Sequence, residues 1–340
     1  MKGFVLILLM VYPWLVNAQS LHYATSYDSA FIQAKEEGKM VLVYAYSPCR
    51  LCDDMTEKVL SLPDMADFLN NHFILVDMDM DERAGVLFKR EHRLKQCPSF
   101  LLFNNQRKLL HKIAGICPGE ELLAKISRGL DERANYAMVK QRYEAGERSI
   151  DLLPDYLFAL DDAGEIVSLS DIARDFFPSF SSEDLVSKKG WIMFQMCVND
   201  YRDAVFQAFL QNKAYFVDRV GEKQVNDKIR QVLMTAFQSC LQDTSGMENP
   251  ALLMVTIDSA GMPERKILRQ LWTLHEKKDY AAIMDFYDQK IFMVEPIFRS
   301  ELGDFLPILM KGADRAQRER ISAYTIKCLK DLRARRSHIK

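Results

Sequence analysis

At 340 residues the chain exceeds the usual size of one domain, and about two domains are expected from typical domain lengths. Hydrophobic residues make up 49% and charged residues 27% of the sequence, which excludes fibrous and disordered classes. The formal net charge of -2 lacks the basic excess of nucleic-acid-binding proteins, so no nucleic-acid partner is expected.

The first 18 residues have the parts of a secretory signal peptide. Lys2 provides the positive start, residues 4–16 form an apolar run, and residues 16–18, Val-Asn-Ala, form a small-residue cleavage site. The run is shorter than the roughly 20 residues that span a bilayer, so removal of residues 1–18 is favoured over a retained membrane anchor. We therefore expect a periplasmic or secreted protein with no membrane contact after cleavage.

Residues 19–134 carry alternating helical and strand patterns. Helical spacing of apolar residues predicts helices at 26–37, after Cys49, and at 63–71, 83–94 and 118–130. Strands are expected at 40–46, 73–80, 101–103 and 108–113, the last two joined by a tight turn. The order is α-β-α-β-α-β-β-α, which predicts an α/β domain.

A Cys-x-x-Cys motif, Cys49 to Cys52, lies between the first strand and a helix. A helix N-terminus offers free N–H groups and a positive dipole, which favour a thiolate, so Cys49 is expected to be the attacking sulfur. Cys52 is then the resolving sulfur, and the Arg50 cation is expected to lower the pKa of Cys49 further. A zinc site needs a second Cys/His pair that the sequence does not offer, so redox chemistry is favoured over zinc binding or structural pairing.

The motif at the end of the first strand, followed by Pro98 just before the third, resembles the thioredoxin fold of secreted bacterial proteins. The other matching residues are Asp77, Asp79 and Gly115. The resemblance implies a central mixed sheet flanked by helices and a redox-active Cys49–Cys52 disulfide, with no other cofactor. It also implies a cis peptide bond at Pro98, which would lie against the disulfide and help to hold an extended substrate.

The chain departs from the family around the cysteine motif and in the strand before it. Thioredoxins carry Trp-Cys-Gly-Pro-Cys, whereas here Ser47-Pro48 precede the motif and Arg50-Leu51 lie inside it. The family's buried strand aspartate, which assists proton transfer from the second cysteine, would align near Val43. Arg50 should shift the pair toward a more oxidising potential.

Cys97 directly precedes the expected cis-proline and would face the Cys49 sulfur. It could fill a small apolar space, exchange disulfides with the motif, or complete a soft-metal site for Cu or Zn with Cys49 and Cys52. The sequence is compatible with all three roles of Cys97.

Residues 135–340 carry helical patterns without strand signals, and no fixed-period repeat is found. We expect an all-α helical domain, either a bundle or a repeat-like superhelix. Helices are predicted at 136–145, 152–161, 169–176, 184–198 and 204–220, after Gly221 as far as Leu241, and at 264–277, 280–292, 302–311 and 315–335. Their aromatic residues are expected to fill helix cores more than a partner groove.

Together these features predict an exported thiol-disulfide oxidoreductase whose helical domain positions it or selects partners. Its partners would be protein thiols or disulfides and a protein that recycles its redox state. A non-catalytic thioredoxin-like interaction scaffold and soft-metal handling remain the alternatives.

Overall fold

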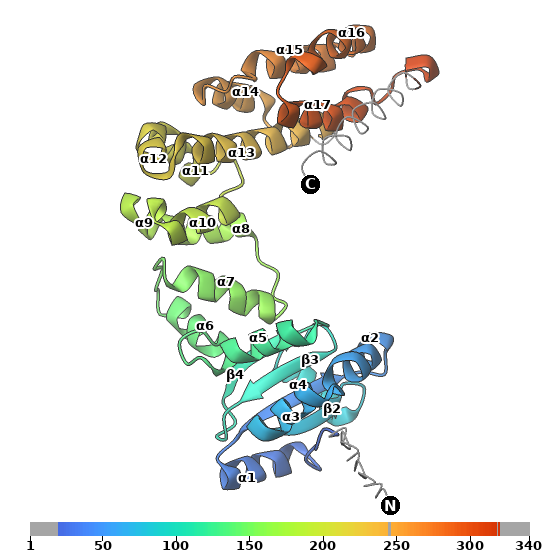
Figure 1. Cartoon of the computed structure of the whole chain (residues 1–340), viewed down its shortest axis with the longest axis vertical. Coiled ribbons are helices and arrows are strands. Elements are labelled where there is room, and N and C mark those ends of the chain that lie inside the picture. The colour runs from blue at the N-terminus through green and yellow to red at the C-terminus, as the bar shows by residue number, and fades with distance from the viewer. Residues whose placement is uncertain (1–19, 244–245, 318, 320–340) are drawn as a thin grey trace, which may run out of the picture. The chain divides into compact units, whose positions relative to one another are not determined.

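The computed structural model describes residues 20–243, 246–317 and 319 (Figure 1). The predicted signal peptide, residues 1–18, and most of the predicted helix at 315–335 lie outside the described residues. The chain divides into two compact units on either side of the Val167–Ser168 bond. Within the described ranges, no helix is long and apolar enough to cross a membrane.

The first unit is built on one four-stranded mixed sheet in the order β2-β1-β3-β4. The strands are β1 (Met40–Tyr46), β2 (Phe73–Asp79), β3 (Ser99–Phe103) and β4 (Leu109–Ala114). Strand β1 pairs parallel with β2 and antiparallel with β3, which in turn pairs antiparallel with β4. The predicted α/β fold with a central mixed sheet is confirmed.

Helices cover both faces of this sheet. Their bounds are α1 (Tyr27–Glu37), α2 (Arg50–Met55), the π-helix η1 (Thr56–Leu60), α3 (Pro63–His72), α4 (Arg83–Glu91) and α5 (Gly119–Leu130). Leu42 and Tyr44 of β1 face a core formed with α2, η1, α3 and α5. Val41 and Val43 face the opposite core, formed with α1 and α4. This alternation follows from the two-residue period of a strand.

Local sequence sets the ends of α1. The Ser26 hydroxyl accepts from the backbone N–H of Ser29, and the Ser29 hydroxyl accepts from the N–H of Ser26, which completes a capping box. Gly38 then ends the helix at φ 68°, a left-handed conformation that favours glycine. The predicted helix at 26–37 is confirmed.

The first unit extends beyond the predicted domain boundary at residue 134. Helices α6 (Tyr136–Glu144) and α7 (Leu152–Asp162) pack against β4 and belong to this unit, although their helical pattern placed them in the expected helical domain. Asp162 is fully buried and accepts hydrogen bonds from His111 of β4 and Arg128 of α5. Helical periodicity identifies the two helices but does not reveal this buried attachment.

The second unit is helical in all its described elements, as expected. The helices are α8 (Leu169–Phe176), η2 (Phe177–Ser179), α9 (Ser182–Val186), α10 (Lys188–Cys197), α11 (Ala204–Gln211), α12 (Lys213–Val220), α13 (Glu222–Gln242), α14 (Pro250–Ser259), α15 (Arg265–Lys277), α16 (Tyr280–Lys290), η3 (Ile291–Met293) and α17 (Pro296–Leu309). Whether they form a bundle or a superhelix stays a prediction.

Two predicted helices are each divided in the structure. The helix expected at 184–198 becomes α9 and α10 because Ser187 takes an extended conformation and its hydroxyl caps the backbone N–H of Gly190. A Cβ at Gly190 would lie 1.8 Å from the Asp184 carbonyl oxygen, so this close turn requires glycine. Asn212 similarly separates α11 from α12. Helix α14 was not predicted.

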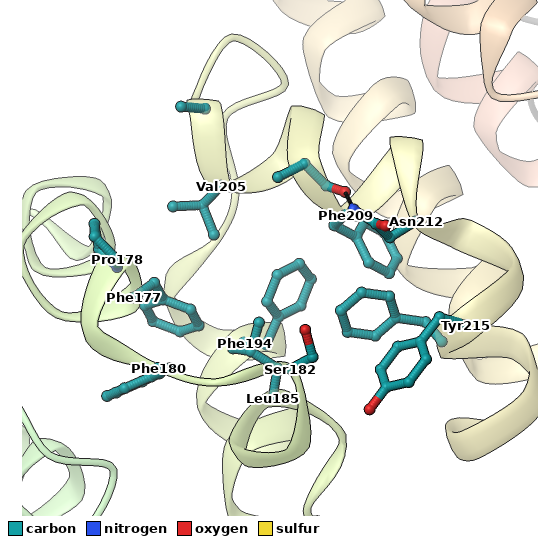
Figure 2. A pocket seen from close by; sticks show the side chains of 13 residues that line it. Phe177, Pro178, Phe180, Ser182, Leu185, Phe194, Val205, Phe209, Asn212 and Tyr215 are labelled. Carbon is teal, nitrogen blue, oxygen red and sulfur yellow. Dashed lines mark hydrogen bonds between the residues drawn. The ribbon is translucent and has the colours of Figure 1, made fainter.

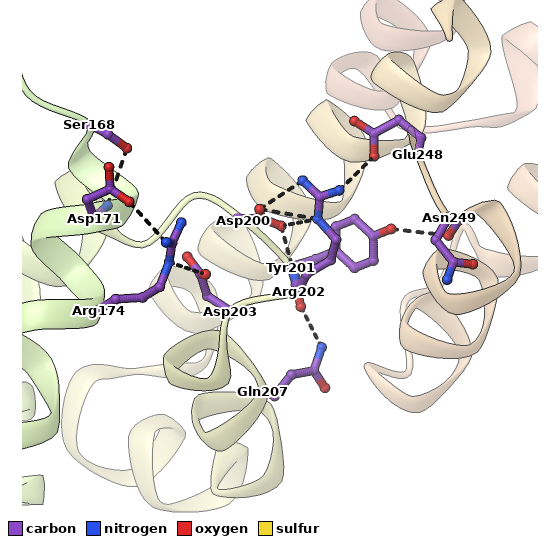
Figure 3. Close-up of polar contacts among 10 residues, drawn as sticks. All are labelled: Ser168, Asp171, Arg174, Asp200, Tyr201, Arg202, Asp203, Gln207, Glu248 and Asn249. Atoms are coloured by element: carbon purple, nitrogen blue, oxygen red, sulfur yellow. Dashed lines mark hydrogen bonds and ion pairs between the residues drawn. The ribbon is translucent and has the colours of Figure 1, made fainter. Parts of the chain in front are cut away.

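Two arginines of the second unit form ion pairs between neighbouring segments (Figure 3). Arg202 forms a bidentate pair with Asp200 and lies 3.5 Å from a Glu248 carboxylate oxygen. Arg174 of α8 lies between Asp171 and Asp203. These pairs join α8, the loop before α11 and the segment before α14.

Candidate functional site

Cys49 is the N-cap residue of α2, as its sequence position predicted. Its sulfur accepts a hydrogen bond from the backbone N–H of Cys52 at 3.4 Å. This bond and the neighbouring Cys52 side chain lower the pKa of the Cys49 thiol. The side chain is half-buried, so its sulfur remains accessible. This is the environment expected of an attacking thiolate.

Cys52 lies one turn further into α2 and is 3% exposed. Its sulfur is 3.2 Å from that of Cys49 and accepts from the backbone N–H of Ser47 at 3.4 Å. Burial raises the pKa of the Cys52 thiol to about 11. The pair therefore combines one accessible sulfur that ionises easily with one enclosed sulfur that holds its proton.

Tyr44 supports the turn that carries Cys52, a contact that the sequence did not predict. Its buried hydroxyl donates to the carbonyl oxygen of Cys52 at 3.1 Å and lies 3.1 Å from the hydroxyl of Thr56. Burial raises the pKa of Tyr44 to about 12, so the phenol keeps its proton. Tyr44 thus ties the central strand to α2 directly beneath the cysteine motif.

The Arg50 side chain is exposed to solvent beside Asp54. The Arg50 side chain is 92% exposed, and its Nε lies 3.9 Å from a carboxylate oxygen of Asp54. The lowered pKa of Cys49 is accounted for by hydrogen bonds at the start of α2. An effect of Arg50 on Cys49 stays a prediction.

The Cys97–Pro98 peptide bond is cis, and it lies immediately before β3. The Pro98 carbonyl oxygen accepts from the backbone N–H of Gly115 at 2.8 Å, which joins the segment to the end of β4. Cys97 is half-buried beside the α1 and α4 core, and its charge when ionised contributes to raising the pKa of Cys52. Cys97 is therefore close enough to the motif for its charge to affect the pKa of Cys52.

A scan against family models matches residues 27–129 to the family described as a thioredoxin-like domain. The matched range contains the whole four-stranded sheet, both motif cysteines and the cis peptide bond. Residues 27–129 form a thioredoxin-like domain.

Several solved structures are similar to the thioredoxin-like domain. A thioredoxin from Thermus thermophilus is 24% identical, with 34% of this chain and 89% of that chain covered and a TM-score of 0.31. A candidate disulphide-isomerase from Bacteroides thetaiotaomicron is 25% identical, with coverages of 34% and 97% and a TM-score of 0.32. An oxidoreductase named DsbH is 18% identical, with coverages of 39% and 96% and a TM-score of 0.31. No curated protein matches the sequence.

Val43 of the thioredoxin-like domain is completely buried between β2 and β3. The apolar residues around it include Val76 and Leu101, so this part of the core supplies no carboxylate for proton transfer. Of the two aspartates that carried part of the resemblance, Asp77 is exposed and Asp79 accepts from the backbone N–H of Asp81 in the turn after β2. The position where the family's buried aspartate was expected is therefore apolar in this chain.

Metal ligation was the third expectation for the cysteines of the thioredoxin-like domain. Over residues 20–243, 246–317 and 319, no three or more His, Cys, Asp or Glu side chains are grouped so as to hold a metal ion. The combination of Cys49, Cys52 and Cys97 as a soft-metal site gains no support from this geometry.

The helical unit contains a separate aromatic cavity of about 480 Å³ (Figure 2). Phe177, Phe194, Phe209 and Tyr215 surround it, and none of its lining residues is charged. The rings of Phe194 and Phe209 pack with their centroids 4.8 Å apart. Most of the predicted core aromatics of this unit are buried, but they leave this space between η2, α9 and α11.

Proposed function

We propose that the protein is an exported thiol-disulfide oxidoreductase that acts on protein disulfides through Cys49 and Cys52. The observation that carries this proposal is the contrast between the two sulfurs: Cys49 is accessible with a lowered pKa, whereas Cys52, 3.2 Å away, is buried with a raised pKa. A purely structural pair has no need of this contrast. Efficient thiol-disulfide exchange requires an accessible cysteine that ionises easily, because the thiolate is the nucleophile.

In the reductive direction, the Cys49 thiolate attacks one sulfur of a substrate disulfide. A Cys49–substrate mixed disulfide forms, and the other substrate sulfur leaves as a thiolate and takes up a proton. Cys52 then loses its proton and attacks Cys49, which releases the second substrate thiol. The substrate gains two electrons, the Cys49–Cys52 disulfide forms, and a dithiol protein would restore the reduced pair.

The same steps in reverse oxidise a substrate dithiol. The direction depends on the reduction potential of the pair relative to that of its partners. Export fits either direction, and it is tested by expressing the full chain with residues 1–18 in a bacterium. The intact mass of the protein recovered outside the cytoplasm should correspond to a chain that begins near Gln19.

Insulin reduction tests the enzymatic proposal directly. Wild-type protein supplied with a dithiol reductant should reduce insulin disulfides faster than the Cys49→Ser/Cys52→Ser variant. Equal rates would favour the alternative of a non-catalytic interaction scaffold.

The Cys52→Ala variant, which cannot resolve the mixed disulfide, should in addition accumulate substrate covalently bound at Cys49.

A further inference from the structure

A cavity of about 340 Å³ lies in the first unit beside the segment that carries Cys97 and Pro98. Gln96 and Ser99, the residues that flank this pair, both line the cavity. Its other walls come from the segment that follows α4, from β4, from α6 and from the segment that follows α7. The space therefore adjoins the region proposed to contact substrate.

The walls of this cavity are strongly cationic. Arg93, Lys95, Lys112 and Lys140 line it, and Glu165 is the one carboxylate among its lining residues. The whole chain carries a formal net charge of -2, so this concentration of positive charge is local. A local excess of one sign in a concave, partly desolvated space attracts ligands of the opposite sign.

Glu165, the carboxylate among the lining residues, already has two partners within the protein. Glu165 accepts a hydrogen bond from the Tyr136 hydroxyl and lies 3.5 Å from Nζ of Lys140. Arg93 and Lys95 are exposed, and neither forms an ion pair within the described part of the chain. Most of the positive charge at the cavity is thus not neutralised by these walls.

Lys112 is one of the two half-buried cations that line the cavity. Its Nζ donates to the His92 carbonyl oxygen at 2.8 Å and lies 4.9 Å from the centroid of the Tyr136 ring. A lysine ammonium has three donors, so the hydrogen bond to His92 leaves two for a ligand. Burial lowers the pKa of Lys112, and an anion beside it would oppose that effect.

Gln96 forms the part of the cavity wall that directly precedes the cis bond. The Gln96 side chain lies between Gly115 and Gly164, where a Cβ would approach its Nε2 to 3.4 and 2.8 Å respectively. Both glycines have positive φ, 86° and 65°, and the Ser99 hydroxyl donates to the Gln96 carbonyl oxygen at 2.8 Å. The cavity and the cis-proline segment are consequently parts of one packed structure.

We propose that this cavity binds an acidic side chain of the substrate polypeptide, so that the protein prefers disulfides flanked by Asp or Glu. This inference rests on the proposed function and names the substrate class for the same site. One carboxylate bound by these cations is expected to improve kcat/KM by about tenfold, the effect of one charge-assisted contact.

The test compares two peptides that share one intramolecular disulfide and differ only in flanking Glu or Gln residues. Wild-type protein should reduce the Glu peptide about tenfold more efficiently, mainly through a lower KM, and 0.5 M salt should diminish the preference. The Arg93→Gln/Lys95→Gln variant should lose most of the preference for the Glu peptide. Lys35→Gln/Lys108→Gln removes the same charge from exposed positions that do not line the cavity, and this control should keep the preference.

Equal efficiency with both peptides, or a preference retained by the Arg93→Gln/Lys95→Gln variant, would overturn the inference and leave the redox proposal intact. Isothermal titration with a Glu peptide whose cysteines are replaced by serine decides the matter without turnover. The full-length protein should bind this peptide, the cavity variant should bind it at least about fivefold more weakly, and inorganic phosphate alone should bind far more weakly. Binding of phosphate as tight as that of the peptide would contradict a polypeptide ligand.

Discussion

Cys49 and Cys52 have the same side chain in very different surroundings. The N–H groups at the start of α2 point toward the sulfur of Cys49, whereas Cys52 is turned into the core beside Ser47. The helix start therefore favours a charge on the outer sulfur, and burial disfavours one on the inner sulfur. This contrast gives each cysteine a distinct role.

Alkylation should distinguish the two thiols. At pH 7 iodoacetamide is expected to modify Cys49 at least tenfold faster than Cys52, because only the thiolate reacts. The rate at Cys49 should reach its plateau below the pH at which a free thiol does, while the pKa of about 11 keeps Cys52 slow until strongly alkaline pH. Peptide mapping by mass spectrometry measures both sites, with Cys49→Ser as the control for Cys52. Similar rates at pH 7 would contradict the assignment of nucleophile and resolving thiol.

The Tyr44 hydroxyl should contribute measurably to stability. Tyr44→Phe removes the donor to the Cys52 carbonyl oxygen and is expected to lower the free energy of unfolding by about 1 kcal/mol, the usual contribution of such a hydrogen bond. Tyr46→Phe is the matched control, because its half-buried ring stacks on Tyr44 but its hydroxyl makes no hydrogen bond within the described chain. Urea unfolding measures both variants, and an equal loss in the two would refute the specific role of Tyr44.

The sequence predicted the two motif cysteines, but it did not predict the hydrogen bond from Tyr44 to the Cys52 carbonyl oxygen. A Cys-x-x-Cys motif after an apolar strand is readable from residue order alone. Tyr44 is one of several apolar or aromatic residues in that strand, and alternation assigns it only to one of two faces. Which face lies beneath α2 depends on how the following chain folds back, so its contact with Cys52 could not be read from the sequence.

Among the secondary-structure elements, α7 is attached to the sheet by a buried charged group. The backbone N–H of Tyr136 donates to Nδ1 of His111, so the ring carries its proton on Nε2 and can donate to Asp162. Arg128 adds a bidentate pair to the same carboxylate, at 2.7 and 2.8 Å. Burial opposes ionisation of Asp162, but the hydrogen bonds from His111 and Arg128 outweigh it and lower its pKa.

Asp162→Asn should destabilise the first unit by about 3 kcal/mol at pH 7, because it leaves Arg128 without its buried partner. Since the folded state lowers the pKa of Asp162, the stability it contributes is complete above the unfolded value of about 4 and is lost as pH falls through the folded pKa. The difference from wild type should therefore shrink in acid. Asp161→Asn changes the exposed neighbour and should have little effect. Thermal unfolding at several pH values measures this, and a difference that does not vary with pH would contradict the mechanism.

The sequence predicted most helices of the second unit, but it did not predict the breaks at Ser187 and Asn212. Helical periodicity continues across Ser187 and Asn212, so each predicted helix is one continuous pattern, and the turns depend on capping and on close backbone approach. Helix α14 is apolar on most sides, with Leu252 and Val255 exposed and Leu253 and Ile257 buried, and so it lacks the amphipathic pattern that reveals a helix.

At the scale of the whole molecule, the family match ends at residue 129 whereas the compact unit extends to Val167. The sequence places the boundary near residue 134 because strand signals stop there. The buried contact of His111 with Asp162 attaches α7 to β4, so the compact unit continues beyond that residue. The two partners are 51 residues apart, and a local sequence pattern does not reveal such a pair.

Two truncations test this boundary. Residues 20–167 should form a folded protein with a cooperative unfolding transition, because the chain then retains α6 and α7. Residues 20–134 should unfold at a clearly lower temperature or fail to unfold cooperatively, because His111 and the buried side of β4 become exposed. Calorimetry compares the two, and equal stability would place the independent folding unit at residue 134.

The contact of Gln96 with Gly164 joins the cis-proline segment to the end of a helical pair outside the matched family range. On the proposed function, we expect substitutions near Gly164 to change the fit of a substrate while the cysteines and their hydrogen bonds stay unchanged. If the proposed function holds, the residues that fit the substrate and the residues that exchange the disulfide would lie on separate segments of the chain, so substitution could alter one without the other.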